Sequence, residues 1–176
     1  MVSFRNTIKN LILMNRIIFL ATIISFFVIS CRNESKPVES SSDINEIEQI
    51  INDYDNGWES KNIEMVLQGY SDNIDWTNAF GDRTQGKEEL RELLNTIFSL
   101  DFVMAGKNNY QDPDITFPNE GIALARSTNI RTGQKWPDGR PMDDRIINHL
   151  RVFKKVDGKW FCINHMISQA HNKLGK

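Results

Sequence analysis

Two hydrophobic periodicities, one after the other, constrain the fold of this chain most strongly. Early in the chain, apolar and aromatic residues recur at steps of three and four and so share one stripe of an amphipathic helix: Ile44, Ile47, Ile51, Tyr54 and Trp58. A short helix is expected over 63–70, and a third helical stripe follows over 90–98. Extended segments are expected at 74–80, 121–131, 142–156 and 159–168. Helices first and strands afterwards is the order of an α+β fold.

The first thirty residues have the pattern of a secretory signal. Arg5, Lys9 and Arg16 form a basic start without an acidic residue, and the run 17–29 is almost wholly apolar. This run is shorter than the roughly 20 apolar residues of a membrane-spanning helix. It leads into Cys31 and resembles a bacterial lipobox, whose cysteine is lipidated and becomes the first residue after cleavage. We therefore expect a lipid-anchored protein of the bacterial cell envelope, with an ordinary signal peptide or an uncleaved anchor as the alternatives.

The composition after the signal predicts one domain without disulfides. Cys31 and Cys162 are the two cysteines, so a lipidated Cys31 leaves Cys162 without an intramolecular partner. Removing the signal removes three of 21 basic residues and none of 23 acidic ones, and the acidic remainder argues against a nucleic-acid binder. The expected organisation has four parts: a signal peptide (1–30), a polar flexible tether (31–42), one domain (43–171) and a short tail (172–176).

Three polar side chains fall on predicted apolar faces. Tyr54 lies on the first helical stripe, Asn78 alternates with Trp76 in the first strand, and Asn148 alternates with Leu150 in the long strand. A buried amide without a partner costs about 1–3 kcal/mol, so each needs a hydrogen-bond partner, a water or a ligand. For each asparagine the alternative is a bond to neighbouring backbone, and Tyr54 could be an ordinary core aromatic. If the three converge, they predict a lined pocket rather than a plain core.

Three motifs carry a family resemblance. The segments 70–81 (YSDNIDWTNAFG), 86–90 (GKEEL) and 157–160 (DGKW) resemble, in order and spacing, the SnoaL-like and ketosteroid-isomerase-like branch of the nuclear-transport-factor-two superfamily. The resemblance covers about 44–168. It implies a curved antiparallel sheet wrapped around about three helices, which together form a cone with an apolar pocket. It also implies a homodimer formed through the outer face of the sheet.

The resemblance also assigns roles to the three polar residues. Tyr54 falls at the position of the isomerases' oxyanion-hole tyrosine, Asn78 at that of their general-base aspartate, and Asn148 at that of the acid that helps to hold the oxyanion. An amide cannot act as a general base, so steroid-isomerase chemistry by the usual route is disfavoured. Tyr54 and Asn148 could still polarise a carbonyl as aligned hydrogen-bond donors in a dry pocket.

The remaining candidates for a catalytic or metal-binding role are Asp75, His149, His165 and Cys162. Asp75 alternates away from Asn78 and is a poor substitute base unless the strand is bulged. His149 is expected at a solvated face or a dimer contact. His165 and Cys162 are three apart on a strand and are expected on opposite faces, which argues against a shared metal. We expect no metal and no cofactor, because no phosphate loop, dinucleotide fingerprint or nucleophile elbow is present.

These observations favour a lipid-anchored binding protein for a small, mostly apolar molecule that carries oxygen. Its contact with the membrane would be through the lipid alone. One alternative is an isomerase, cyclase or hydrolase that uses Tyr54 and Asn148 as oxyanion donors, with Asp75 or His165 as the base. A third possibility is a non-catalytic dimeric interaction module with a filled core. The predicted ligand-binding residues, with Trp136 as a lid, are Tyr54, Trp58, Trp76, Asn78, Asn148 and Trp136.

Overall fold

A computed structural model describes residues 40–170 of the protein. Cys31, the signal segment, most of the tether and the tail lie outside the described residues. The helices of the described part are α2 (Ser41–Glu59), α3 (Ile63–Leu67), α4 (Lys87–Phe98) and α5 (Asp101–Met104). Its strands are β1 (Tyr70–Thr77), β2 (Arg83–Gln85), β3 (Lys107–Tyr110), β4 (Asp114–Asn119), β5 (Ile122–Thr132), β6 (Arg145–Val156) and β7 (Lys159–Gln169).

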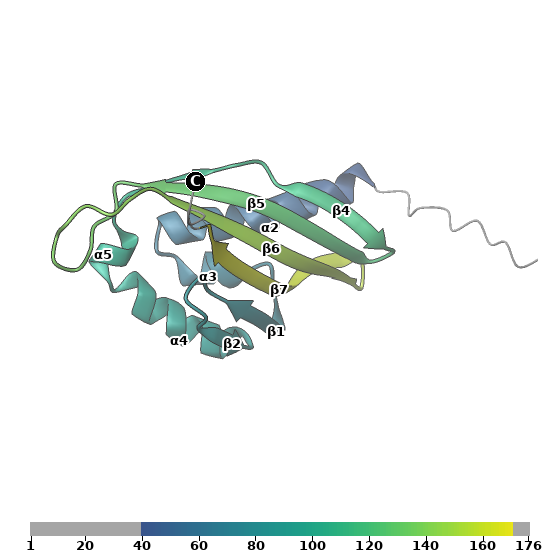
Figure 1. Cartoon of the computed structure of the whole chain (residues 1–176). Helices are drawn as coiled ribbons and strands as arrows, with labels where there is room; N and C mark the ends of the chain where they lie inside the picture. Colours follow the sequence, from purple (N-terminus) through teal and green to yellow (C-terminus); the bar gives the residue numbers. More distant parts are fainter. Residues whose placement is uncertain (1–39, 171–176) are drawn as a thin grey trace, which may run out of the picture. The chain divides into compact units, whose positions relative to one another are not determined.

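The predicted α+β fold is confirmed, with a curved seven-stranded sheet in the order β2-β1-β7-β6-β5-β3 and β4 paired to β5 (Figure 1). The neighbours pair antiparallel except β1 and β7, which run parallel, so the sheet is mixed rather than wholly antiparallel. The predicted helices and the three later strands are present. The short strands β2, β3 and β4 were not predicted, because segments of three to six residues carry too little periodicity to be recognised.

Helix α2 begins at Ser41, among the serines that precede the domain. The Ser40 side chain caps it by accepting a hydrogen bond from the Ser42 N–H. Asp43 lies in the first turn, where its Oδ1 accepts from Trp160 Nε1 at 2.8 Å and from Lys155 Nζ at 2.5 Å. These bonds join the start of α2 to the β6–β7 hairpin.

The register of that hairpin sets which side chains of β6 point inward. Lys155 pairs with Trp160, and Phe153 pairs with Cys162. Because directly opposite residues share a face, the odd-numbered residues of β6 lie with buried Trp160 on the inner face. The sequence-based assignment placed Asn148 and its even-numbered neighbours inside and is therefore wrong. Both faces of β6 carry apolar residues, so alternation within the strand did not distinguish them.

A β-bulge changes which residues of β7 face inward, odd-numbered or even-numbered. Phe153 pairs with Cys162, but the preceding residue Val152 pairs with Asn164, so one extra residue of β7 is accommodated between them. Both Cys162 and His165 consequently face inward, and both are fully buried. The prediction that these two side chains face opposite ways is wrong, because it assumed an unbroken two-residue period.

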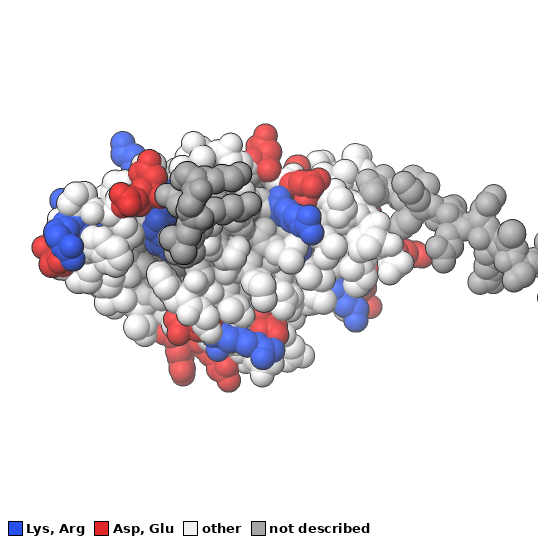
Figure 2. Space-filling view, viewed as in Figure 1, with Lys and Arg blue, Asp and Glu red and all other residues white. Residues whose placement is uncertain are grey.

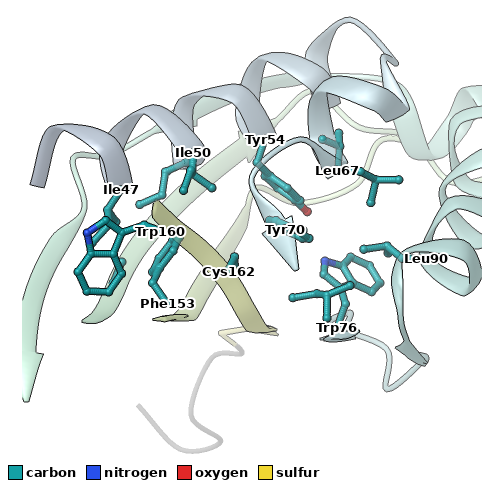
Figure 3. Packing of buried hydrophobic residues seen from close by; sticks show 14 of the residues in the cluster. Ile47, Ile50, Tyr54, Leu67, Tyr70, Trp76, Leu90, Phe153, Trp160 and Cys162 are labelled. Atoms are coloured by element: carbon teal, nitrogen blue, oxygen red, sulfur yellow. The ribbon is translucent and has the colours of Figure 1, made fainter. Parts of the chain in front are cut away.

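The core lies between α2 and the inner face of the sheet (Figure 3). At one end, Ile47 of α2 packs with Phe153 and Trp160 of the hairpin. Fully burying an aliphatic or aromatic side chain of this size contributes about 1.5–3 kcal/mol to stability. At the other end, Tyr54 lies beside Tyr70, with their ring centroids 5.8 Å apart. The candidate site lies at this second end of the core, beside Tyr54.

On the visible part of the sheet face turned away from α2, charged side chains are few, and most of those in this view lie toward its borders (Figure 2). Ile146 and Met166 are about half exposed there, at 47% and 51%. Among residues 40–170, no helix combines the length and the apolar character needed to cross a membrane.

Candidate functional site

A cavity of about 220 Å³ lies where α2, the α4–α5 segment and the inner face of the sheet meet. Most of its wall is apolar or aromatic, contributed by Tyr54, Trp58, Trp76, Ala79, Phe80, Ile97, Leu100, Val103, Tyr110, Ile147 and Ile167. Its polar lining comes from Asn78, Asp82, Asn129, Arg131, Arg145 and His149. An apolar cavity with a small number of polar groups is the usual form of a small-molecule site.

Four of the six predicted ligand-binding residues line this cavity: Tyr54, Trp58, Trp76 and Asn78. Asn148 does not, because it lies on the outer face of β6, where its Oδ1 accepts from Thr128 Oγ1 at 3.2 Å. The predicted convergence of Tyr54 with Asn148 is therefore wrong. Trp136 is 48% exposed on the β5–β6 loop and is not part of the cavity wall.

Asn78 shapes the mouth of the cavity through backbone bonds. Strand β1 ends at Thr77, and Asn78 Oδ1 accepts from the N–H groups of Phe80 and Asp82, both at 2.9 Å. Its Nδ2 donates to Asp82 Oδ2 at 2.8 Å. This is the alternative considered from the sequence, a side chain that caps a turn. Because the strand has ended, Phe80 is 78% exposed instead of sharing the inner face with Trp76.

Tyr54 is the central aromatic residue of the site. Its side chain is 2% exposed, lines the cavity and lies beside Tyr70 (Figure 3). Its ring stacks on Trp58 and lies under the Arg151 guanidinium, whose Cζ is 5.0 Å from the ring centroid. Burial raises the pKa of Tyr54, although Arg151 and Trp76 oppose the shift. The hydroxyl therefore stays protonated at neutral pH and can donate into the cavity.

Three buried side chains form a hydrogen-bonded series that ends at the cavity. Tyr70 Oη lies 2.6 Å from His165 Nδ1, and His165 Nε2 lies 2.9 Å from His149 Nδ1. His149 Nε2 is buried, and no hydrogen bond to it is present in the described part of the chain. His149 is 7% exposed and lines the cavity, so the prediction of a solvated or dimer-contact histidine is wrong.

The hydrogen bonds among Tyr70, His165 and His149 can run in either of two directions, and the charge of Arg151 favours one of them. Arg151 lies near enough to the Tyr70 hydroxyl to lower its pKa, against the larger upward effect of burial. Arg151 makes no hydrogen bond to this oxygen, but its positive charge attracts the lone pairs of the oxygen. This favours the arrangement in which the Tyr70 hydrogen points to His165 Nδ1. In that arrangement His165 Nε2–H donates to His149 Nδ1, and the neutral His149 carries its proton on Nε2. The cavity is thus offered an N–H donor.

The imidazoles are neutral and the cation beside them is buried. Burial is the largest effect that lowers the pKa values of His149 and His165 well below their ordinary value, and Arg151 adds to it. Arg151 is 1% exposed, donates to Ser127 Oγ at 3.0 Å and lies 3.7 Å from Asp55. Burial raises the pKa of Asp55 to about 6, with Arg151 acting in the opposite direction. The region behind Tyr54 therefore combines neutral imidazoles with one weakly paired cation.

The sequence did not identify Tyr70, His149, Arg131 or Arg145 as site residues. The hairpin could have indicated His149, because a two-residue turn at Asp157-Gly158 pairs Trp160 with the odd-numbered face of β6. No such signal was available for His165, whose inward position depends on the bulge. Within residues 40–170, no group of three or more His, Cys, Asp or Glu side chains is placed to hold a metal ion.

Comparison with known proteins supports the fold. No protein-family model matches the chain, and no curated protein sequence matches it. A Caulobacter vibrioides protein with a cystatin-like fold has a TM-score of 0.65 at 19% identity, over 73% of this chain and 89% of its own. A ketosteroid isomerase-like protein from Erwinia carotovora atroseptica has a TM-score of 0.63 at 17% identity, over 76% and 100%. A hexachlorocyclohexane dehydrochlorinase from Novosphingobium barchaimii has a TM-score of 0.65 at 12% identity, over 77% and 92%. The chain therefore has the cystatin-like α+β fold of the ketosteroid-isomerase-like proteins, which confirms the fold expected from the sequence resemblance.

Proposed function

We propose that this protein is a lipid-anchored envelope protein that binds a small, mostly apolar molecule through an oxygen on that molecule. The observation that carries the proposal is a set of donors without acceptors on an apolar cavity wall. Trp76 Nε1 and His149 Nε2 are buried and unpaired in the described structure, and both residues line the cavity together with Tyr54. Each unpaired buried donor costs about 1–3 kcal/mol, which a ligand oxygen would offset.

Trp76 and Tyr54 form the neutral part of this donor set. The indole N–H is near enough to the Tyr54 hydroxyl to lower its pKa, although the two make no hydrogen bond. Both therefore point toward a common region of the cavity wall. The structural neighbours support a small-molecule role, because one is named for dehydrochlorination of a small chlorinated hydrocarbon and another is named ketosteroid isomerase-like.

The binding proposal is tested by native mass spectrometry of the protein purified from its own organism. A retained small molecule is expected, and Trp76→Phe should reduce its occupancy because the ring is kept and one donor is lost. Asn148→Ala is the matched control, since Asn148 lies on the outer face of the sheet and should leave occupancy unchanged. Equal loss of the molecule in both variants would contradict this cavity as its site.

The lipid anchor is proposed from the sequence, since Cys31 lies outside the described residues. Metabolic labelling with a fatty-acid analogue should label the wild-type protein and leave Cys31→Ser unlabelled. Labelling of both forms would contradict a lipobox at this position.

An enzyme is the second candidate, and the Tyr70–His165–His149 chain favours it. If a bound oxygen took the proton from His149 Nε2, His149 Nδ1 would accept the proton of His165 Nε2. His165 Nδ1 would then accept the Tyr70 proton, and a tyrosinate would form beside Arg151. The Nε and Nη2 atoms of Arg151 are buried without hydrogen bonds and could stabilise that charge. Such a chain supplies one proton to a substrate without admitting water.

Tyr70→Phe tests the relay. The variant keeps the ring but removes the hydroxyl that donates to His165 Nδ1. In ¹⁵N spectra of the wild-type protein we expect His149 to be protonated at Nε2 and His165 also at Nε2. In Tyr70→Phe the His165 tautomer should become mixed. An unchanged tautomer in the variant, or a wild-type His149 protonated at Nδ1, would contradict the relay.

A further inference from the structure

Arg131 places a positive charge at the cavity without a carboxylate beside it. The residue is 4% exposed and lines the cavity. Its Nη2 donates to the backbone oxygens of Val103 at 2.6 Å and Ala105 at 3.1 Å, and its Nε is buried without a hydrogen bond. No Asp or Glu in the described part of the chain lies within 4.0 Å of it. Backbone oxygens orient this guanidinium but do not neutralise its charge.

Arg145 is a second cation of the cavity lining, and its side chain is half-buried. Its Nε donates to Gln169 Oε1 at 2.8 Å and its Nη1 to Gln134 Oε1 at 3.1 Å, and both partners are neutral amides. Its Cζ lies 5.5 Å from the centroid of the exposed Phe80 ring at the cavity mouth. Its Nη2 has no hydrogen bond within residues 40–170. The side chain is thus held in place with one edge of the guanidinium free.

The acidic groups nearby do not balance the two cations. Asp82 is the carboxylate of the cavity lining, but it is exposed and accepts from Asn78 Nδ2. Glu59 is exposed on α2 and accepts from Asn108 Nδ2, and it raises the pKa of Arg131 without forming an ion pair. Burial and the charge of Arg145 lower the pKa of Arg131. Burying an unpaired cation is costly, so this excess positive charge favours an anion in the cavity.

We propose that the ligand of this cavity is an organic carboxylate, with Arg131 and Arg145 binding the carboxylate and the apolar wall holding the rest of the molecule. This inference rests on the proposed binding function and adds the charge of the ligand to it. The planar guanidinium presents paired N–H donors that match the two oxygens of a carboxylate. His149 Nε2–H adds a neutral donor at the same cavity. A neutral oxygen could satisfy single donors but would leave both charges uncompensated.

The size and character of the wall define the rest of the ligand. Trp58, Ile97 and Ile167 belong to the apolar wall of the cavity, whose volume is about 220 Å³. A one- or two-ring aromatic acid, or a medium-chain fatty acid, has the required apolar body. Dicarboxylates and sugars fit poorly, because their further polar groups would face an apolar wall.

The test compares matched acids and alcohols by calorimetric titration of the full chain. The probes are 2-naphthoate against 2-naphthol and octanoate against octanol, which differ mainly in charge. We expect each acid to bind at least ten-fold more tightly than its alcohol. Arg145→Gln should remove most of that preference while alcohol binding changes little. Arg126→Gln is the control, because Arg126 is an exposed arginine of the same sheet that lies outside the cavity.

Arg131→Lys tests whether the paired N–H donors of the buried guanidinium are needed, because lysine keeps the charge but lacks these donors. It should weaken binding of the acids more than binding of the alcohols. If this variant does not fold, the salt dependence of the wild-type protein replaces it, and acid binding should weaken with added chloride while alcohol binding stays constant.

The outcomes separate the two proposals. Alcohols that bind as tightly as the acids would overturn the carboxylate inference and leave the binding function standing. An acid preference that survives Arg145→Gln and Arg131→Lys would also overturn it. Failure of every acid and alcohol to bind would overturn the binding function and the inference together.

Discussion

Acidification from pH 7 to pH 5 is expected to destabilise the protein, because His149 and His165 are neutral when folded. Burial lowers both pKa values well below 6.5, whereas in the unfolded chain they return to about 6.5. Below that pH the unfolded state binds more protons, so the free energy of unfolding falls as the pH falls. A histidine that stays neutral in the folded state costs about 2 kcal/mol over this interval, and the pair costs about 4 kcal/mol.

Asp55 opposes part of this loss. Its pKa is raised to about 6 by burial, so on acidification the folded state takes up a proton there before the unfolded state does. With an unfolded value near 3.8, this contributes about 1 kcal/mol of stability between pH 7 and pH 5. The Asp55 side chain is 15% exposed, so solvent screening reduces this figure only modestly. The net expected loss is about 3 kcal/mol.

The assay is urea unfolding followed by tryptophan fluorescence at pH 7, 6 and 5. Each of His149→Gln and His165→Gln should reduce the loss between pH 7 and pH 5 by about 2 kcal/mol, because glutamine does not titrate. Asp55→Asn should increase the loss by about 1 kcal/mol, since the opposing proton uptake is removed. A wild-type pH dependence that both histidine variants reproduce in full would refute the reasoning.

Two further predictions concern packing and the cavity mouth. Gly57→Ala should lower the free energy of unfolding by about 1–3 kcal/mol despite the better helix propensity of alanine, because its Cβ would lie 2.7 Å from the Val66 backbone nitrogen. Thermal unfolding measures this change, and a stabilised variant would contradict the close contact. Asn78→Asp should destabilise by about 1 kcal/mol at pH 7 and less at pH 3, because a carboxylate would replace the amide that donates to Asp82. A pH-independent effect would point to a cause other than charge repulsion.

Part of the candidate site could be predicted from the sequence. The stripe that contains Tyr54 and Trp58 forms α2, and the face of Trp76 in β1 points inward. These positions depend on periodicity within one element, which local sequence encodes directly. Asn78 reached the cavity for a different reason from the one expected, because the strand ended before it and its amide capped the turn.

The sequence by itself determined the class of fold, the order of its longer helices and strands and the residues of the helical stripe, because repeating patterns specify which side of an element is buried. The tertiary structure alone decided which face of β6 turns inward, since both faces carry apolar residues and the pairing with β7 selects between them. It also decided that His165 faces the core, because one bulged residue reverses the alternation of the strand beyond it. The hydrogen bonds among Tyr70, His165 and His149 join segments far apart in the chain. Only the tertiary packing brings His149 to the same cavity as Arg131 and Arg145.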